Sequence, residues 1–239
     1  MKKVSRKLLS TLRQPAKKLD VFFHKMFAGE NDFLGNPLRG DRCIEFAFVV
    51  EQLFAMPKET SVLDIGSADS PLTTIISVLG FRQVHGIDLL PSPLFFERVK
   101  FVRGDFLDDT LTQKNLLPRY DAVVICSTIE HFGLERYAGQ EIVNENVATA
   151  DIQCLEKVSK ILNKKGKLIL TIPYGQEKVI APLHRVYNKN GLMMRYLLNN
   201  FSLEREQYYR NNSNNIWEPC SETEAASVTA AADNYALGL

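Results

Sequence analysis

The sequence predicts an α/β fold built on a mostly parallel sheet with helices on both faces. Two observations predict it. A strand, a tight turn, a helix and a second strand follow one another between Ser61 and Asp88, and short apolar runs bounded by turn residues are typical of buried parallel strands. A further helix and strand, over residues 151–162 and 167–175, repeat this alternation. The chain of 239 residues is long enough for one such domain with additions.

The turn after the first strand, residues 61–65, is the first candidate binding site. A parallel sheet binds its ligands at the carboxyl ends of its strands, near the point where the strand order reverses. We therefore expect residues 64–70 to form the lip of a pocket. Asp88 follows the second strand, residues 84–87, and lies 24 residues beyond Asp64, near the spacing at which a carboxylate reaches a ribose hydroxyl pair.

The acidity of this turn indicates the charge of its ligand. The glycine positions of a dinucleotide-binding G-x-G-x-x-G turn read Gly66, Ala68 and Ser70 here, with Asp64 and Asp69 beside them. Two carboxylates would repel a pyrophosphate, whereas they would attract a ligand with ammonium and sulfonium centres. The turn therefore favours a cationic nucleoside. The alternative is an ordinary turn between a strand and a helix.

A third strand, residues 99–102, leads into Gly104-Asp105-Phe106. An acid just past a strand end can accept the exocyclic amine of an adenine, and Phe106 is placed to pack on the ring. Asp105 as a helix N-cap is the alternative, although Asp108 and Asp109 serve that role equally well.

The fourth strand, residues 120–126, is the most continuously apolar in the chain and delivers Ser127, Glu130 and His131 to the same edge of the sheet. His131 is expected to take a proton from an acceptor hydroxyl while Glu130 orients it. The alternative for His131 is a histidine at a helix start that bonds to the backbone.

These motifs resemble a known family. DIGSADSP, residues 64–71, is similar to motif I of class I S-adenosylmethionine-dependent methyltransferases, D/E-x-G-x-G-x-G, and the Gly104-Asp105 position is similar to their adenine contact. The resemblance implies a Rossmann-like fold with a seven-stranded, mostly parallel sheet and an antiparallel C-terminal hairpin. It implies that S-adenosylmethionine is held by Asp64, Gly66, Ser67, Asp88, Leu89, Gly104, Asp105, Phe106 and Ser127, with Glu130 and His131 catalytic.

Two further stretches narrow the resemblance. Residues 130–139 and 184–187 are similar to the EH-x-G-L-x-R-Y-G and H-R-x-Y stretches of a little-characterised family of predicted methyltransferases, whose members resemble enzymes of surface-polysaccharide and glycan biosynthesis. This implies an acceptor site that includes Arg136 and Tyr137. His184 and Arg185 also suit a hydroxylated or phosphorylated acceptor such as a sugar nucleotide. The alternative for Arg185 is a salt-bridged loop.

A divalent metal is the less favoured alternative. Some O-methyltransferases that resemble this sequence after the fourth strand carry Glu-x-x-Glu-His there and bind a metal ion that polarises the acceptor oxygen. Ser127 stands at the first of these glutamate positions. Only Glu130, His131 and the distant His184 remain as ligands.

The ends of the chain complete the expected organisation. Residues 43–54 predict a helix whose apolar face holds Phe46, Val49, Val50 and Leu53. Asn163–Gly166 is expected to end the helix over 151–162. Residues 201–209 predict a sixth strand, residues 211–215 an exposed turn, Ile216-Trp217 a return strand, and Ser221-x-x-Glu224 a capped terminal helix. The expected units are a basic amphipathic segment and connection (1–42), the methyltransferase domain (43–220) and a helix or tail (221–239).

Composition bounds the setting of the protein. The net charge is +1, so no global field draws the chain to nucleic acid. Four separated cysteines with no C-x-x-C pair favour a reducing, cytoplasmic location. The basic, amphipathic first 27 residues are expected to cap the domain, and peripheral contact with an anionic inner-membrane surface is the alternative.

The expected function is therefore S-adenosylmethionine-dependent O-methylation of a sugar, a sugar nucleotide or another small hydroxylated acceptor. Two alternatives remain from other classes: a catalytically inactive nucleoside-binding or regulatory protein with the same fold, and an NAD-dependent oxidoreductase. Titration with the donor, its demethylated product and NAD distinguishes them.

Overall fold

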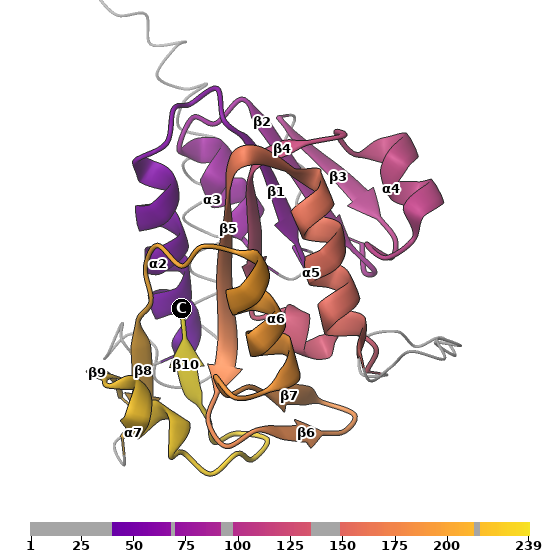
Figure 1. The fold of residues 1–239 in the computed structure, drawn as a ribbon. Helices are drawn as coiled ribbons and strands as arrows, with labels where there is room; N and C mark the ends of the chain where they lie inside the picture. The colour runs from indigo at the N-terminus through magenta and orange to yellow at the C-terminus, as the bar shows by residue number, and fades with distance from the viewer. Residues whose placement is uncertain (1–39, 68–69, 92–97, 135–148, 213–215) are drawn as a thin grey trace, which may run out of the picture.

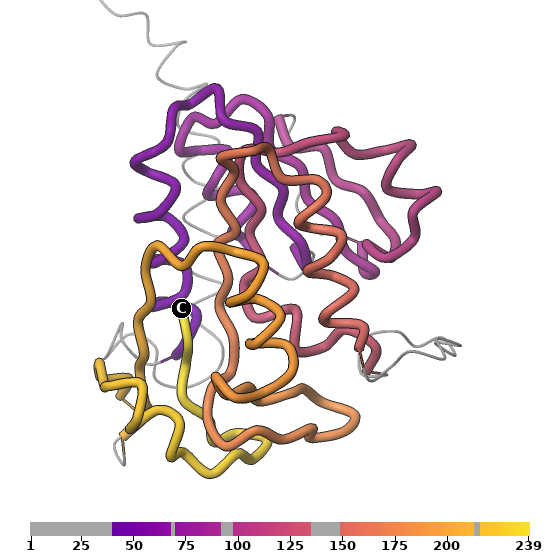
Figure 2. The backbone as a smooth tube through the Cα atoms, in the orientation of Figure 1, coloured from indigo at the N-terminus to yellow at the C-terminus, as the bar shows by residue number. Residues whose placement is uncertain are grey.

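The computed structural model describes residues 40–67, 70–91, 98–134, 149–212 and 216–239. Over these residues the main sheet has eight strands in the order β3-β2-β1-β4-β5-β10-β8-β9. The order reverses between β1 and β4, which is where open α/β sheets bind ligands. Figure 1 shows the layers of strands and helices as a ribbon, and Figure 2 shows the same backbone as a tube in the same orientation.

Five parallel strands form the first part of the sheet, and three antiparallel strands form the rest. The parallel strands are β1 (Ser61–Ile65), β2 (Gln83–Asp88), β3 (Val99–Arg103), β4 (Tyr120–Cys126) and β5 (Leu162–Tyr174). The others are β10 (Ala236–Gly238), β8 (Tyr208–Asn211) and β9 (Trp217–Cys220). β1 is buried along its whole length, as the central strand of a sheet covered on both faces must be.

Helices cover both faces of this sheet (Figure 1). α2 (Asp41–Phe54) and α3 (Leu72–Val78) pack on one face around Phe48, Leu53 and Ile76. α5 (Ala150–Ile161) and α6 (Leu192–Asn200) pack on the other face around Leu155, Met193 and Tyr174. The shorter helices are α4 (Asp109–Asn115), α7 (Glu222–Ala226) and the 3₁₀ turn η2 (Ile129–His131). The structure therefore confirms the expected fold class and, with eight strands, extends the expected sheet by one.

A separate hairpin follows β5. Its strands, β6 (Lys178–Ile180) and β7 (His184–Val186), pair antiparallel, and they project beyond the carboxyl end of β5 in Figure 1. The sequence pattern predicted no strands here, and a salt-bridged loop was the alternative expected for Arg185. This hairpin packs against the turn that carries Glu130 and His131, as described below.

The C-terminal segment differs most from expectation. β10 lies between β5 and β8, pairing with both, so the main sheet extends past the expected boundary at residue 220. The sixth strand covers only Tyr208–Asn211 rather than residues 201–209. The return strand and the capped helix were predicted correctly: α7 begins with a full capping box between Ser221 and Glu224.

The helix over 151–162 also ends differently. α5 passes at Leu162 directly into β5, and Gly166 does not adopt a positive φ. Asn163 instead donates its side-chain amide to Asp121 Oδ1 at 2.6 Å, within an irregularity where the register with β4 shifts. The strand pairing thus overrides the Gly and Lys signals of a helix end.

The basic segment lies outside the described residues, except for its last three positions, 40–42. Among the helices that the structure does describe, none combines the length and apolarity needed to cross a bilayer.

Candidate functional site at the carboxyl edge of the sheet

The turn after β1 brings two chain segments into close contact. Gly66 has φ +84° and donates its amide to the Ile87 carbonyl of β2 at 2.9 Å. A Cβ at Gly66 would overlap the Thr128 side chain, so only glycine allows the turns after β1 and β4 to meet. Ser67 follows, and its Oγ is buried without a hydrogen-bond partner among the described residues. A buried hydroxyl at this position is a natural contact for a polar ligand group.

Asp64 does not face this turn as predicted. The side chain is 1% exposed, and Oδ2 accepts a 2.5 Å hydrogen bond from Thr73 of α3. Burial raises the pKa of Asp64 to about 7, with the Thr73 bond opposing the shift and the Asp88 charge adding to it. Asp64 is therefore a buried carboxyl that connects β1 to α3, and the expectation that it contacts the donor directly is wrong.

Asp88 and Asp105 remain at the edge, each in a local turn. Asp88 Oδ1 accepts from the Leu90 amide at 2.8 Å, and Asp105 Oδ1 accepts from the Leu107 amide at 2.8 Å. The Gly104 amide donates to the Asp88 carbonyl at 2.8 Å, which places the two turns side by side. The N-cap of α4 is Asp108, so the N-cap alternative for Asp105 is wrong. Of the three carboxylates expected to hold the donor, Asp88 and Asp105 therefore remain, in two adjacent turns.

Phe106 and Leu89 differ in their exposure. The Phe106 side chain is 3% exposed and belongs to the core under α5, with the Lys157 ammonium 5.2 Å from its ring centroid. The expected packing of this ring on an adenine is therefore wrong. Leu89 is 41% exposed beside Asp88 and provides apolar surface at the edge.

The turn after β4 is held by a buried polar cluster that was not predicted from the sequence. Ser127 has φ +41°, and its amide donates to Thr171 Oγ1 of β5 at 2.9 Å. Glu45 of α2 is fully buried and accepts from the hydroxyls of both Ser127 and Thr171. Arg42 donates to Glu45 at 3.2 Å and to the Cys126 carbonyl at 3.3 Å. The sequence feature that could have indicated this cluster is Glu45, a carboxylate at helical spacing from Val49 on an apolar helix face.

This arrangement also changes the interpretation of α2 and of Ser127. The buried side chains of α2 are Glu45, Phe48, Val49 and Leu53, so the expected face was rotated: Phe46 and Val50 are only partly buried. Burial raises the pKa of Glu45, although Arg42 and the two hydroxyls oppose the shift. The Ser127 hydroxyl points to Glu45, and the next residue, Thr128, contacts Gly66 at the edge.

Glu130 and His131 lie together on η2, as predicted. His131 Nε2 is 3.8 Å from Glu130 Oε1, and the His131 side chain is 18% exposed. Glu130 is 2% exposed, and its Oε2 has no hydrogen-bond partner among the described residues. Burial raises the pKa of Glu130 to about 8, and the charge of Glu45 contributes in the same direction. The carboxyl group is therefore mostly protonated at neutral pH.

The tautomer of His131 follows from its second contact. Nδ1 lies 2.7 Å from the Leu183 carbonyl oxygen, and a carbonyl can only accept a hydrogen bond. Nδ1 therefore carries a proton, and in the neutral ring the lone pair is on Nε2, on the Glu130 side. The backbone alternative for His131 holds for Nδ1, but it leaves Nε2 as the nitrogen that can take a proton.

Arg185 does not reach outward to an acceptor. It is 6% exposed, and its Nη1 donates to the carbonyl oxygens of Phe132 at 2.6 Å and Glu130 at 3.3 Å. Its Nε lies 3.8 Å from Asp151 Oδ2. The expected role in substrate binding is wrong, and the salt-bridged alternative is confirmed.

His184 lies next to the edge within a group of rings. Its ring centroid is 6.4 Å from that of His131 and 5.6 Å from that of Tyr235, which lies 6.0 Å from Trp217. Tyr235 donates its hydroxyl to Asp41 Oδ2 at 2.8 Å, and burial raises its pKa. His184 is thus near His131 as expected, although it is only 6% exposed. No pattern in the sequence indicated that Trp217 and Tyr235 would join this group.

Two of the predicted residues, Arg136 and Tyr137, lie outside the described residues. Within the described ranges, no group of three or more His, Cys, Asp or Glu side chains is placed to hold a metal ion. Glu130, His131 and His184 therefore do not form such a group.

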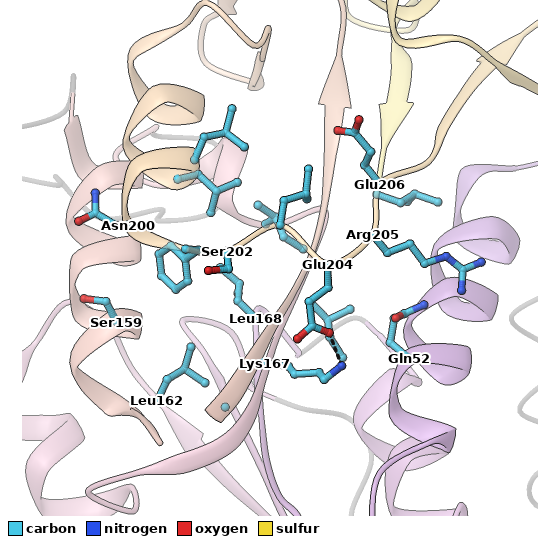
Figure 3. Close-up of a pocket in the computed structure, with 18 of the residues that line it drawn as sticks. Gln52, Ser159, Leu162, Lys167, Leu168, Asn200, Ser202, Glu204, Arg205 and Glu206 are labelled. Atoms are coloured by element: carbon cyan, nitrogen blue, oxygen red, sulfur yellow. Dashed lines mark hydrogen bonds and ion pairs between the residues drawn. The ribbon is translucent and has the colours of Figure 1, made fainter. Parts of the chain in front are cut away.

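A cavity of about 1090 Å³ lies elsewhere, along β5 from Leu162 to Tyr174. Figure 3 shows Gln52 of α2 on one side of it, Ser159 of α5 on the other, and residues 202–206 passing across, with Lys167 paired to Glu204. Among the described strands, β10 pairs only with residues 172–174 of β5 on this side. None of the described residues that line the cavity belongs to the turns after β1 and β4, so it is not part of the candidate site.

Comparison with known proteins agrees with the fold. A family model described as "Caenorhabditis protein of unknown function, DUF268" matches residues 104–235, more than half of the chain. No curated protein matches the sequence.

Solved structures provide two further comparisons. A crystal structure of Burkholderia thailandensis 1,6-didemethyltoxoflavin-N1-methyltransferase, with bound 1,6-didemethyltoxoflavin and S-adenosylhomocysteine, is 17% identical, covers 86% of each chain and has a TM-score of 0.52. The PH0226 protein of Pyrococcus horikoshii OT3 is 18% identical over 59% of this chain and 65% of its own, with a TM-score of 0.38. The first likeness shows a Rossmann-like fold shared with a methyltransferase.

Proposed function

The chain belongs to the family described as Caenorhabditis protein of unknown function, DUF268, a name that assigns no chemistry, and we propose from its residues that it is an S-adenosylmethionine-dependent methyltransferase. The observation that carries the proposal is the combination of the strand-order reversal between β1 and β4 with the Glu130–His131 pair on the turn after β4. The solved methyltransferase with bound S-adenosylhomocysteine has the same fold.

The residues at the edge fit the donor in charge and hydrogen bonding. Gly66 keeps the turn after β1 free of a Cβ, the buried Ser67 hydroxyl lacks a partner in the described chain, and Asp88 supplies a carboxylate at the end of β2. A carboxylate at this place suits the ribose hydroxyls, and its charge suits a sulfonium. Asp105 and Leu89 extend this surface toward the adenine side, and Asp64 supports it from behind.

The donor would supply an activated methyl group, and the chain has to orient the acceptor, exclude water and receive a proton. In our proposal the acceptor hydroxyl oxygen forms a bond to the methyl carbon while the sulfur–methyl bond breaks. The hydroxyl proton passes to His131 Nε2, the nitrogen that the Leu183 carbonyl leaves unprotonated. Glu130 Oε1, 3.8 Å from Nε2, can accept a hydrogen bond from the imidazolium that forms.

The proposed acceptor is a small hydroxylated molecule, with sugars and sugar nucleotides as the first class to test. The partly buried rings of His131 and Tyr235, which both lie beside the His184 ring, support this class, because aromatic side chains combine an apolar face with a polar edge. The net charge of +1 argues against a nucleic acid acceptor.

A labelled-methyl assay tests the proposal. The full chain would be incubated with S-adenosylmethionine carrying a labelled methyl group and with a panel of sugars and sugar nucleotides. We expect transfer to a member of the panel and its loss in His131→Gln. Donor binding without transfer to any hydroxylated acceptor would favour a non-catalytic nucleoside-binding protein, and binding of NAD instead of the donor would favour an oxidoreductase.

A further inference from the structure

Among the described residues, three hydrogen bonds join the β6–β7 hairpin to the turn of Glu130 and His131, and two of them come from one side chain. Arg185 donates to the carbonyl oxygens of Glu130 and Phe132, the residues on either side of His131, while the Leu183 carbonyl accepts from His131 Nδ1. Both the backbone around His131 and its imidazole ring are therefore fixed by residues that lie more than 50 positions further along the chain.

The charge of Arg185 is balanced behind the turn. Asp151 is 4% exposed, lies 3.8 Å from Arg185 Nε, and accepts from the Tyr187 hydroxyl at 3.1 Å. A buried guanidinium needs such a partner, and its planar fork can serve a carboxylate and two carbonyls at once. A 3₁₀ turn also leaves carbonyl oxygens unsatisfied at its C-terminal end, where a cation is favourable.

On the basis of the proposed function, we propose that Arg185 is a positioning residue that fixes the turn of Glu130 and His131 and thereby keeps His131 in the tautomer with its lone pair on Nε2. Arg185 makes no contact with substrate in this role. It acts through the carbonyls of Glu130 and Phe132, which hold His131 within reach of Leu183. Asp151 and Tyr187 orient the guanidinium from behind.

Nitrogen NMR of the histidine rings tests this role without an acceptor. The full chain has four histidines, and comparison with His131→Gln assigns the signals of His131. At about pH 8.5, above the usual His pKa of about 6.5, we expect wild-type His131 to show one protonated nitrogen, Nδ1, and one unprotonated nitrogen, Nε2. A wild-type spectrum with Nε2 protonated would overturn the proposal, and this readout needs no variant at Arg185.

Arg185→Lys is the informative substitution. Lysine keeps the charge, but its single ammonium cannot reproduce the fork that reaches Glu130, Phe132 and Asp151. We expect the two ring nitrogens of His131 to move toward a common, averaged shift as the ring leaves Leu183. Arg195→Lys, at an exposed position of α6, is the matched control and should leave the His131 spectrum unchanged. An Arg185→Lys spectrum that equals that of wild type overturns the proposal.

A milder variant covers the case in which Arg185→Lys does not fold. Tyr187→Phe removes only the hydroxyl that bonds Asp151, and we expect a smaller shift of the His131 signals in the same direction. No shift in Tyr187→Phe, when Arg185→Lys is unfolded, counts against the proposal. Calorimetric titration with S-adenosylhomocysteine separates this inference from the proposed function. If wild type fails to bind S-adenosylhomocysteine while the NMR results are as expected, the proposed function alone is contradicted. If wild type binds it but the His131 spectrum does not change in Arg185→Lys, the inference alone is contradicted.

Discussion

The Thr171 hydroxyl of β5 donates to Glu45 Oε1 of α2 across 2.6 Å, joining residues 126 positions apart. The same carboxyl group accepts from the Ser127 hydroxyl. One buried side chain therefore connects the helix before the sheet with the ends of β4 and β5. The conformation of Ser127, and with it the course of the turn toward Glu130, depends on this contact.

Substitution of Glu45 tests that dependence. Glu45→Ala leaves the buried hydroxyl of Thr171 and the Ser127 hydroxyl without their acceptor, so we expect a loss of unfolding free energy of about 1–3 kcal/mol. Glu45→Gln keeps one acceptor oxygen and should lose less. Urea unfolding measures both, with Glu51→Ala, an exposed position paired to Arg205, as the control. Equal losses for Glu45→Ala and Glu51→Ala would argue against the structural role of Glu45.

Gly66 allows the turns after β1 and β4 to approach, and Gly80 provides the matched comparison. Both have positive φ, +84° and +98°, so alanine at either position carries backbone strain of about 1–2 kcal/mol. A Cβ at Gly80 has 3.9 Å to its nearest neighbour, whereas one at Gly66 overlaps Thr128. We expect Gly66→Ala to lose about 1–3 kcal/mol more than Gly80→Ala, and only Gly66→Ala to weaken binding of S-adenosylhomocysteine. Thermal and calorimetric measurements showing identical behaviour would contradict this.

Glu130 should make the protein less stable as the pH rises. Its pKa is about 8 in the folded chain and about 4.3 in an unfolded one. Between these values the folded state holds the proton that the unfolded state has released, so the unfolding free energy falls with rising pH, at most by about 1.4 kcal/mol per pH unit for this group.

Glu130→Gln removes that contribution, while Asp64, with a pKa of about 7, still contributes in the same direction. We expect a shallower decline from pH 5 to 8.5 in urea unfolding of Glu130→Gln. The exposed Glu59→Gln should retain the wild-type slope. A slope in Glu130→Gln as steep as that of wild type would show that Glu130 is not buried in its neutral form.

Asp88 should govern donor affinity. Asp88→Asn keeps an acceptor for the Leu90 amide but removes the charge, and we expect S-adenosylhomocysteine to bind at least about 10-fold more weakly, a change of about 1.4 kcal/mol. Asp108→Asn is the control at the same edge, because asparagine caps α4 as well as aspartate does. Calorimetry on both variants gives the comparison. Unchanged affinity in Asp88→Asn would remove Asp88 from the site.

The sequence predicted the parts of the fold that depend on local pattern. β1 and β4 are continuous apolar runs, and the capping box of α7 is a fixed spacing of two residue types. β10 was missed because three residues show neither alternation nor length, and its place in the sheet comes from pairing with strands distant in the sequence. The predicted helix ended one residue too late, and Gly166 was taken as its end signal. Local Lys and Gly signals cannot reveal that the residues after the helix pair with β4.

The position of the Glu130–His131 pair could be predicted, whereas its catalytic role stays a prediction. Glu130 and His131 follow a buried strand and lie together. Phe106 and Arg185 were assigned to ligands because an aromatic ring or a guanidinium near a strand end suits both a ligand and the core, and only burial decides between them. The partners of Arg185 are carbonyl oxygens and Asp151, whose approach depends on the tertiary fold.

Binding of the donor product to the candidate site can be measured by calorimetric titration of the full wild-type chain with S-adenosylhomocysteine, with NAD titrated in parallel. We expect saturable one-to-one binding of S-adenosylhomocysteine at micromolar concentration, about −8 kcal/mol, and no saturable heat with NAD. Absence of saturable binding of S-adenosylhomocysteine up to millimolar concentration, or tighter binding of NAD, would contradict the proposed function.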